Sequence, residues 1–400
     1  MDQVQQPIKE EDLFSYQRHK WLRNDREERD MRYVEFNLDA LISRALRKGR
    51  DNPKPEGKEC KFSPPYPDIG SLSIPLTDTG VKVTKLLEGD NNKTLLLTMN
   101  DGDEVIARLP NPIAGPSYFT VASEIATRRL ISLTLDPIPM PRVWDWDFRH
   151  KNEVGAEWIL EDKAAGLPLR QFWFNMDRKT QFYIVRQVVE IEKKLGAIRF
   201  PHHAACEYIG KHAADDLSTL SHPNLSLDNI FINPDDKRIT CLTGWQGTVV
   251  SPPILKPLYP PFLDSKFETL SKNANEKQPR DLYRKLIKEA DPLRYDRIYE
   301  NPKEYHVITA PLSAIRCSYE AQTTFELRES IINFIDYYDS KSGEKSLPDD
   351  SKTPTDLIVQ TAQTYLWMAV CSQKISRQRN AGLGTINIIT SSLRAGTNLA

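Results

Sequence analysis

The 400-residue sequence lacks several features that would place it in a specialised class of protein. No uncharged apolar run approaches about 18 residues, so no segment predicts a membrane-spanning helix. The five cysteines lie far apart and form no paired or CxxC pattern, which indicates reduced thiols inside a cell. A formal net charge of −1 gives no basic field for nucleic acid or an anionic membrane. The N-terminus lacks the apolar core of a secretory signal and is not poor in acidic residues, so we expect a cytoplasmic protein.

What is present is typical of a folded enzyme-sized chain. The hydrophobic fraction of 39% and the charged fraction of 27% are ordinary for a globular protein. Residues 13–49 predict an N-terminal helical segment, with Asn37 as the N-cap of its last helix and Gly49 as the stop signal. Five prolines among polar residues in 51–68 predict an extended linker.

The middle of the chain alternates between strand and helix patterns. Residues 81–109 predict antiparallel strands, with a hairpin turn at Asp101-Gly102. The further predicted elements are a helix opening at Pro116 and Ser117, a strand at 158–160, a helix at 178–195, a strand–turn–strand unit over 230–242, and mainly helical structure over 281–338.

Residues 222–229 read His-Pro-Asn-Leu-Ser-Leu-Asp-Asn, which is the most informative stretch of the chain. Kinase-fold enzymes use a loop of the form His-x-Asp, four residues, then Asn, in which Asp accepts the proton of the attacking hydroxyl and Asn holds magnesium. His222 and Asn229 stand at this spacing, but the Asp position holds Asn224. An amide has no basic lone pair near neutral pH, so Asn224 cannot accept that proton.

Several collinear motifs extend the similarity along the chain. They are VIARLPNPIAGP at 105–116, ASEIAT at 122–127, PMPRV at 139–143, GAEWIL at 155–160, LSHP at 220–223, LDNIF at 227–231, RIT at 238–240 and WQG at 245–247. On these motifs the chain resembles the aminoglycoside phosphotransferase and choline kinase-like family. More narrowly, it is similar to the fungal phosphotransferase-enzyme branch of the altered-inheritance-of-mitochondria 9 type. The similarity covers roughly residues 12–338.

The resemblance implies an α+β, protein-kinase-like fold of two lobes, with a small β-rich N-lobe and a larger helical C-lobe. We therefore expect an N-terminal helical extension and linker at 1–68, an N-lobe at 69–163 and a C-lobe at 164–338. Residues 339–400 form a divergent C-terminal extension, which is expected to be partly disordered.

The resemblance also implies a nucleotide site. Arg108 takes the place of the strand lysine that grips the nucleotide phosphates, and Glu124 takes the place of its paired glutamate. Glu161 and Lys163 follow the strand expected to contact adenine through its backbone. The phosphate-covering loop keeps only Gly89 of two expected glycines and carries an aspartate after it, so its hold on phosphate is weakened.

The metal and catalytic positions are altered. Asn229 matches the metal-ligand asparagine, but Gly244 stands where the family has the second metal-binding aspartate. Magnesium needs oxygen ligands, usually carboxylates, and Gly244 supplies none from a side chain. Asp228 is the only nearby carboxylate that could replace the base at Asn224, and His222 fits a structural role better than a chemical one.

Two readings of function follow, and both stay open on the sequence. The first is a catalytically impaired, pseudokinase-like protein with weakened ATP and Mg binding, which acts through a protein partner. The second is an active ATP-dependent phosphotransferase for a hydroxyl or amine of a small-molecule acceptor. A degraded or mis-spliced gene product is a third alternative. No nucleic-acid partner is expected, and the mitochondrion enters as a location through the resemblance alone.

Overall fold

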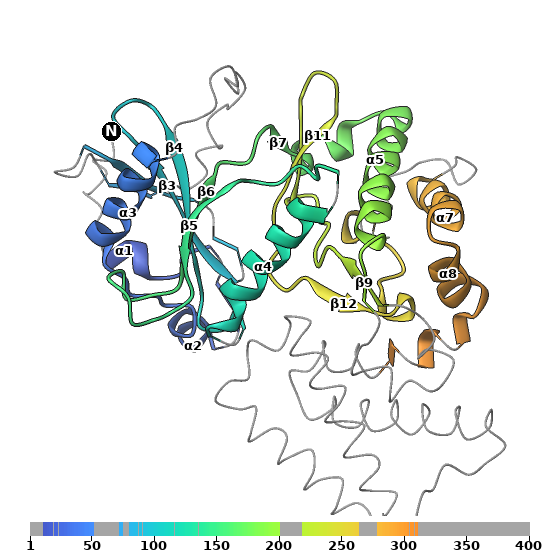
Figure 1. Cartoon of the computed structure of the whole chain (residues 1–400), viewed down its shortest axis with the longest axis horizontal. Coiled ribbons are helices and arrows are strands. Elements are labelled where there is room, and N and C mark those ends of the chain that lie inside the picture. Colours follow the sequence, from blue (N-terminus) through green and yellow to red (C-terminus); the bar gives the residue numbers. More distant parts are fainter. Residues whose placement is uncertain are drawn as a thin grey trace, which may run out of the picture. The chain divides into compact units, whose positions relative to one another are not determined.

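The computed structural model describes residues 11–18, 20–22, 24–51, 72–74, 80–86, 88–89, 91–115, 117–134, 136–200, 218–263, 278–303, 305–307 and 309–310 (Figure 1). The proline-rich stretch 52–68 and the C-terminal extension 339–400 lie outside these residues. The chain divides into two compact units. Unit 1 holds the residues up to Leu130, Pro137–Phe174 and Leu227–Gln246, and unit 2 holds the remainder. The domain boundaries expected from the sequence remain predictions.

Unit 1 is built on an antiparallel sheet of six strands in the order β1-β2-β3-β4-β6-β5. The strands are β1 (Leu72–Ile74), β2 (Lys82–Lys85), β3 (Asn92–Thr98), β4 (Glu104–Pro110), β5 (Val143–Asp147) and β6 (Trp158–Asp162). The predicted hairpin joins β3 to β4, because Gly102 has a φ of 85° that few other residues adopt. Met99 closes the turn by donating its N–H to the carbonyl of Asp103 at 2.8 Å.

Alternation along the β3–β4 hairpin gives the sheet two different faces. On one face Leu95 lies opposite Ala107 in the strand register, and both are fully buried in the main core of unit 1. On the other face Thr94 lies opposite Arg108. The polar Arg108 is therefore directed away from the core that the N-terminal helices cover.

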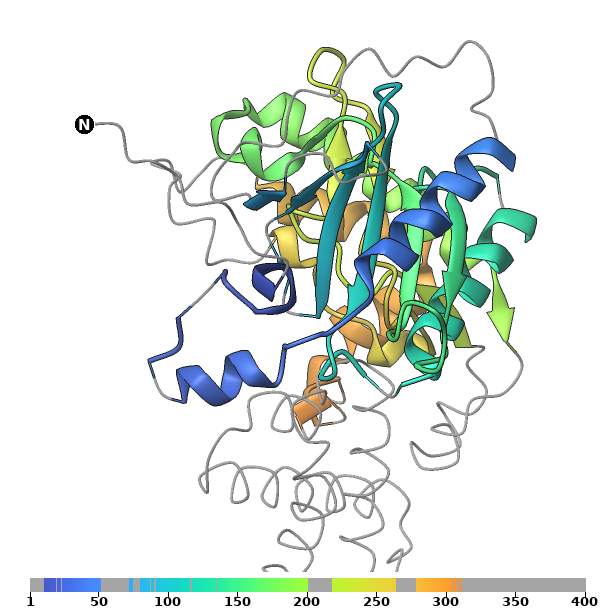
Figure 2. The ribbon, with the colours of Figure 1, turned by 90° about the vertical axis from the view of Figure 1, so that its left-hand side faces the viewer.

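The N-terminal segment holds three helices, α1 (Glu11–Phe14), α2 (Asp25–Asp30) and α3 (Leu38–Asp51), which are the blue segments in Figure 2. Side chains of α1 and α3 pack into the core on the first face of the sheet. Asn37 caps α3 as predicted, since its Oδ1 accepts a hydrogen bond from the Ala40 N–H at 3.0 Å. The stop predicted at Gly49 is wrong, because α3 continues to Asp51. Glycine weakens a helix interior by only about 1 kcal/mol and does not oblige the helix to end.

Helix α4 (Phe119–Thr134) follows β4 and carries Glu124. It begins later than the predicted opening at Pro116 and Ser117. Tyr118 has a φ of 72°, a left-handed conformation that cannot belong to an α-helix. A small antiparallel sheet completes unit 1, in the order β11-β10-β7. Its strands are β7 (Leu167–Pro168), β10 (Ile230–Ile232) and β11 (Ile239–Leu242), and the turns η1 (Leu169–Gln171) and η2 (Trp173–Asn175) follow β7.

The described part of unit 2 is mainly helical. Its elements are α5 (Arg178–Gly196), β8 (Arg199–Phe200), β9 (Ser218–Ser221), β12 (Val249–Ser251), η4 (Pro253–Leu255), η5 (Pro261–Leu263), α7 (Pro279–Ala290), α8 (Pro292–Tyr295) and the π-helical turn η7 (Asp296–Glu300). The predicted helix at 178–195 is confirmed as α5, which Asp177 caps by accepting the Thr180 N–H at 2.9 Å. The predicted α+β fold class, with a β-rich and a helical unit, is confirmed.

A buried charge cluster ties α5 to the segment around α8. Arg294 donates to Glu192 at 3.1 Å, and the Tyr283 hydroxyl donates to the same carboxylate at 2.8 Å. Lys256 lies beside this cluster, 3.7 Å from Asp291. Burial, and then the positive charge of Arg294, lower the pKa of Lys256 to about 8 from 10.5.

Lys256 should therefore make the stability of the protein rise at alkaline pH. Between about pH 8 and 10.5 the unfolded chain binds one proton at this lysine that the folded protein has released, so the free energy of unfolding increases with pH. In urea titrations from about pH 7 to 9.5, the wild-type protein should gain stability relative to Lys256→Met above about pH 8. The prediction would be contradicted if the free energies of unfolding of the wild-type protein and of Lys256→Met differed by the same amount at every pH in that range.

No helix within the described ranges combines the length and the apolar character needed to cross a bilayer.

Candidate functional site

The first part of the candidate site is an ion pair between Arg108 on β4 and Glu124 on α4. The Arg108 Nη1 donates to Glu124 Oε2 at 3.0 Å, and Nη2 donates to Oε1 of the same carboxylate. Such a two-pronged contact fixes both side chains in one orientation. The sequence predicted this pair, and the structure brings the two residues together.

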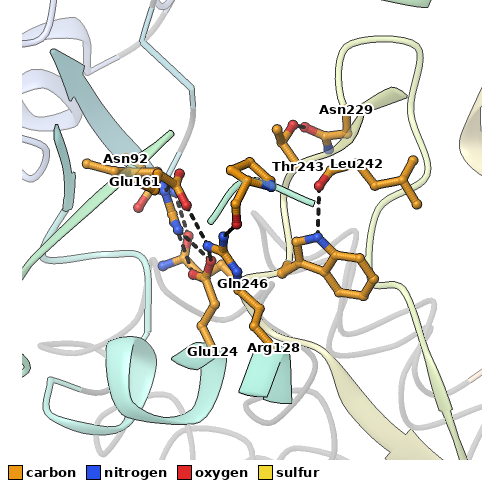
Figure 3. Close-up of polar contacts among 11 residues, drawn as sticks. Asn92, Glu124, Arg128, Glu161, Asn229, Leu242, Thr243 and Gln246 are labelled. Carbon is orange, nitrogen blue, oxygen red and sulfur yellow. Dashed lines mark hydrogen bonds and ion pairs between the residues drawn. The ribbon is translucent and has the colours of Figure 1, made fainter. Parts of the chain in front are cut away.

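Two further residues join the pair to make a network of four charges, which Figure 3 shows with Glu124, Arg128 and Glu161 labelled. Arg108 also donates through Nε to Glu161 at 3.2 Å, and Arg128 donates to the other oxygen of Glu161 at 2.5 Å. Arg128 donates further to the carbonyl of Pro141. The sequence analysis did not single out Arg128, although its i, i+4 spacing from Glu124 on one helix was a usable signal.

The network is buried and electrically balanced, with two guanidinium groups facing two carboxylates. Burial alone would lower the pKa of Arg108, but Glu124 and Glu161 outweigh it, so the pKa lies above its usual value. Burial alone would raise the pKa of Glu161, but Arg108 and Arg128 hold it below its usual range.

The side chains of Glu161, near the end of strand β6, and Lys163, just after it, both make contacts within unit 1. Glu161 belongs to the charge network, and Lys163 forms an ion pair of 2.7 Å with Glu104. The sequence analysis assigned Glu161 and Lys163 to a backbone contact with adenine, which these side-chain contacts neither use nor block. That contact stays a prediction.

Gly89 lies in the loop between β2 and β3 and is not required there by geometry. A Cβ built on Gly89 would meet nothing within 4 Å, and its φ lies outside the left-handed range. The predicted contact of this loop with phosphate stays a prediction.

The catalytic-like loop crosses from unit 2 to unit 1. His222 is buried in unit 2, and its Nδ1 accepts the backbone N–H of Asn224 at 3.1 Å. Because Nδ1 accepts this bond, the imidazole can donate only through Nε2. The bond from the Asn224 N–H means that His222 shapes the loop as well as filling space. Asn224, at the position of the missing catalytic aspartate, is exposed.

Asp228 lies in unit 1 and is held by an arginine. Arg170 Nη2 donates to Asp228 Oδ2 at 2.6 Å, and Arg170 Nε donates to the other carboxylate oxygen. The hydrogen bond that Arg170 donates to Asp228 also raises the pKa of Arg170. Both oxygens of the Asp228 carboxylate are thus engaged by one guanidinium.

Asn229 and Gly244, the two expected metal positions, are adjacent in unit 1. The Thr243 hydroxyl donates to Asn229 Oδ1 at 3.3 Å, and the Thr243 N–H donates to the Asn229 carbonyl at 3.0 Å (Figure 3). Gly244 has a φ of 79°, and a Cβ there would lie 2.6 Å from Asn229 Nδ2. The amide of Asn229 therefore occupies the space that a side chain at 244 would need.

A second amide links the same segment to the sheet. Gln246 lies two residues after Gly244 and accepts a hydrogen bond of 2.5 Å from Asn92, the first residue of β3 (Figure 3). Trp245, between Gly244 and Gln246, is buried, and its indole donates to the Leu242 carbonyl at 2.9 Å. Asn92 and Gln246 were not among the predicted site residues, because a cross-sheet amide pair leaves no local pattern in the sequence.

Within the described ranges no group of three or more His, Cys, Asp or Glu side chains is arranged to hold a metal ion. The oxygen atoms that meet at Asn229 and Thr243 belong to an amide and a hydroxyl, which are weaker ligands for magnesium than carboxylates.

The motifs and this geometry agree with sequence comparisons. Altered inheritance of mitochondria protein 9 of Candida tropicalis is 24% identical over 199 residues, which are 47% of this chain and 32% of that protein. The Saccharomyces cerevisiae protein of the same name is 23% identical over 219 residues, 48% of this chain and 34% of its own length. The chain is thus similar to the altered-inheritance-of-mitochondria 9 proteins over about half of its length. The resemblance inferred from the motifs is thereby confirmed.

A shorter and stronger match covers part of the chain. A subtelomeric hrmA-associated cluster protein of Aspergillus fumigatus is 38% identical over 123 residues, 31% of this chain and 24% of that protein. The chain thus matches about a third or less of the length of these relatives. No protein-family model matches it. The altered-inheritance-of-mitochondria 9 relatives are described as mitochondrial, and a cytoplasmic location for this chain stays a prediction.

Two solved structures of phosphotransferases resemble this fold at low sequence identity. A macrolide 2'-phosphotransferase of Brachybacterium faecium has a TM-score of 0.37 at 14% identity, with 84% of this chain and 98% of that chain covered. An aminoglycoside phosphotransferase in a streptomycin–ATP ternary complex has a TM-score of 0.42 at 11% identity, covering 74% of this chain and 99% of that one.

Proposed function

We propose that this protein is a catalytically impaired member of the phosphotransferase-like proteins, which retains a nucleotide-binding arrangement and has lost the magnesium-dependent reaction. The single observation that carries the proposal is the state of position 244. Gly244 lacks the carboxylate, and a Cβ at this position would lie 2.6 Å from Nδ2 of Asn229.

The base position supports the same conclusion. Phosphoryl transfer depends on electrostatic stabilisation by metal ions and on an aspartate that accepts the proton of the acceptor hydroxyl. Asn224 cannot accept a proton, and Asp228 is engaged by Arg170 through both oxygens. Loss of a general base typically slows a reaction by about 10²–10⁴-fold. Loss of the metal carboxylate adds to this, because the two groups serve different parts of the transition state.

The retained part is the charge pair of Arg108 and Glu124. An active kinase needs its strand cation and helix glutamate in contact, and these two side chains meet in a two-pronged ion pair. Arginine is permanently charged and suits phosphate, so Arg108 can attract a nucleotide without a metal ion. We therefore propose ATP as a ligand that is bound weakly and independently of magnesium.

The pair of Arg108 and Glu124 is also the observation that favours the second candidate, an active small-molecule phosphotransferase. That candidate requires a metal site built from Asn229 and substrate oxygens alone. The acceptor would be a hydroxyl or an amine. The two candidates differ in one measurable property, the magnesium dependence of ATP binding.

Thermal unfolding of the purified protein separates the candidates. ATP in the presence of EDTA should raise the unfolding midpoint, and added magnesium should leave that rise unchanged, because a ligand of the native state stabilises it according to concentration over Kd. A rise that appears only with magnesium would establish the active phosphotransferase reading. No rise under either condition would remove nucleotide binding from the proposal.

A matched variant extends this test to the reaction itself. Asn224→Asp restores the base position at an exposed site, so the substitution should leave the fold unchanged. Phosphate release from ATP should stay at the background rate in this variant, since the carboxylate at 244 is still absent. Measurable ATP turnover in Asn224→Asp would contradict the proposed role of Gly244.

A further inference from the structure

The N-terminal segment of residues 11–18, here called the strap, holds the loop between β2 and β3. The Gln17 N–H donates to Glu88 Oε2 at 2.9 Å, and the Arg18 guanidinium donates to the Glu88 carbonyl at 2.8 Å. Glu88 is the described residue directly before Gly89 and is almost fully buried. The strap therefore grips the loop by both the side chain and the backbone of Glu88.

Two buried lysines complete this contact from the sheet. Lys93 donates to Glu88 Oε1 at 2.6 Å, and Lys85 lies 3.4 Å from the same oxygen. Lys85 also donates to the carbonyls of Asp12 at 3.0 Å and Ser15 at 2.5 Å. Both ammonium groups are thus occupied by the loop carboxylate and by strap carbonyls.

The lysines lie on the face of the sheet opposite Arg108. In the register Lys85 stands across from Leu95, and Lys93 is two residues before Leu95 on the same strand, so all three share one face. Arg108 pairs across with Thr94 and lies on the other face. Lys85 and Lys93 therefore do not serve a phosphate bound beside Arg108, and they hold the loop from behind.

The charged groups of this cluster fix the position of Glu88 more than they stabilise the protein. Charged groups in a protein interior gain little over apolar residues of similar size, because desolvation offsets their attraction. The neighbouring Leu13 and Phe14 of the strap already supply apolar packing in the core of unit 1. What a charged cluster adds is a single geometry, in which Glu88 must lie where two ammonium groups and a backbone N–H converge.

We propose that the strap is a positioning element of the nucleotide site, which sets the place of the β2–β3 loop before a nucleotide binds. The inference rests on the nucleotide binding proposed above. The loop keeps one glycine where the resemblance implies two, and the strap and Lys93 fix the position of Glu88 directly beside that glycine. A pre-ordered loop strengthens binding because its conformational entropy has already been lost.

The variant Glu88→Gln tests the proposal, since it keeps the size of the side chain and removes its charge. We expect amide hydrogen exchange at Gln17 and at the loop residues 86–91 to accelerate, and the affinity for ATP in EDTA to fall about tenfold. That factor corresponds to ordering about one further residue on binding. Arg18→Ala, at an exposed residue, removes one tie to the loop and should show the same changes in smaller size if Glu88→Gln folds poorly.

The control is Asn37→Ala, which removes the hydrogen bond that caps α3 in the same N-terminal segment. It should lower the stability while leaving loop exchange and ATP affinity at the wild-type values. Equal acceleration of loop exchange in Asn37→Ala and Glu88→Gln would overturn the proposed role of the strap, as would unchanged exchange in Glu88→Gln. If the wild-type protein binds no ATP, the nucleotide site fails, while the exchange data still decide whether the strap orders the loop.

Discussion

Replacing Arg128 by alanine is expected to lower the free energy of unfolding by about 3–5 kcal/mol, since it leaves buried charge without its partner. Arg128 is 4% exposed and donates to Glu161 at 2.5 Å and to the Pro141 carbonyl. Its loss leaves two carboxylates facing the single guanidinium of Arg108. Urea unfolding followed by circular dichroism measures the change directly.

Arg129 offers a matched control, because it is the next residue on α4 and is exposed. Arg129→Ala should change the free energy of unfolding by less than about 0.5 kcal/mol. If the two substitutions have equal effects, the four-charge network does not stabilise unit 1 in the way its geometry indicates. The comparison removes helix propensity from the result, since both changes replace arginine by alanine on one helix.

Restoring the family's carboxylate by Gly244→Asp is expected to destabilise the protein and to create no magnesium site. A side chain at a φ of 79° costs about 1–3 kcal/mol, and its Cβ would collide with the Asn229 amide at 2.6 Å. Gly155→Asp is the matched control, because Gly155 has the same φ of 79° and nothing within 4 Å of its Cβ position. Gly244→Asp should therefore be the more damaging of the two by about 1 kcal/mol or more.

A double-mutant cycle isolates the collision. Asn229→Ala removes the amide, so Gly244→Asp in that background should cost no more than Gly155→Asp, to within about 0.5 kcal/mol. Thermal unfolding of Gly244→Asp with ATP should remain unresponsive to magnesium. A magnesium-dependent rise of the midpoint in this variant would show that the site accepts the carboxylate, and that a single substitution separates the chain from an active metal centre.

Local patterns in the sequence predicted the parts of the fold that depend on short-range physics. The hairpin at Asp101-Gly102, the cap at Asn37 and the helix at 178–195 each follow from residue preferences within a few positions. The pair of Arg108 and Glu124 was identified by its place in a resembled family, and the structure brings the two side chains into contact. The helix end at Gly49 was wrong, because glycine disfavours a helix without terminating it.

Contacts between distant segments were beyond the sequence. Glu161 was assigned a backbone role, and only the register of β6 beside β4 shows that its side chain joins Arg108. The strap contact joins residues about seventy positions apart, between Gln17 and Glu88. A lysine in a strand is normally interpreted as facing solvent. The burial of Lys85 and Lys93 could not be predicted, because their ammonium groups meet carbonyls of the strap more than sixty positions away as well as the nearby Glu88.

The sequence by itself determined which chemical groups this protein can bring to a reaction. An amide at 224 can accept no proton and a glycine at 244 can offer no carboxylate whatever the fold, because those properties belong to the side chains. Only the tertiary structure decided which groups are available. It commits Asp228 to Arg170, places the Asn229 amide against Gly244, and turns an N-terminal extension into the strap of a loop, because hydrogen bonds and excluded volume act between atoms that folding alone brings together.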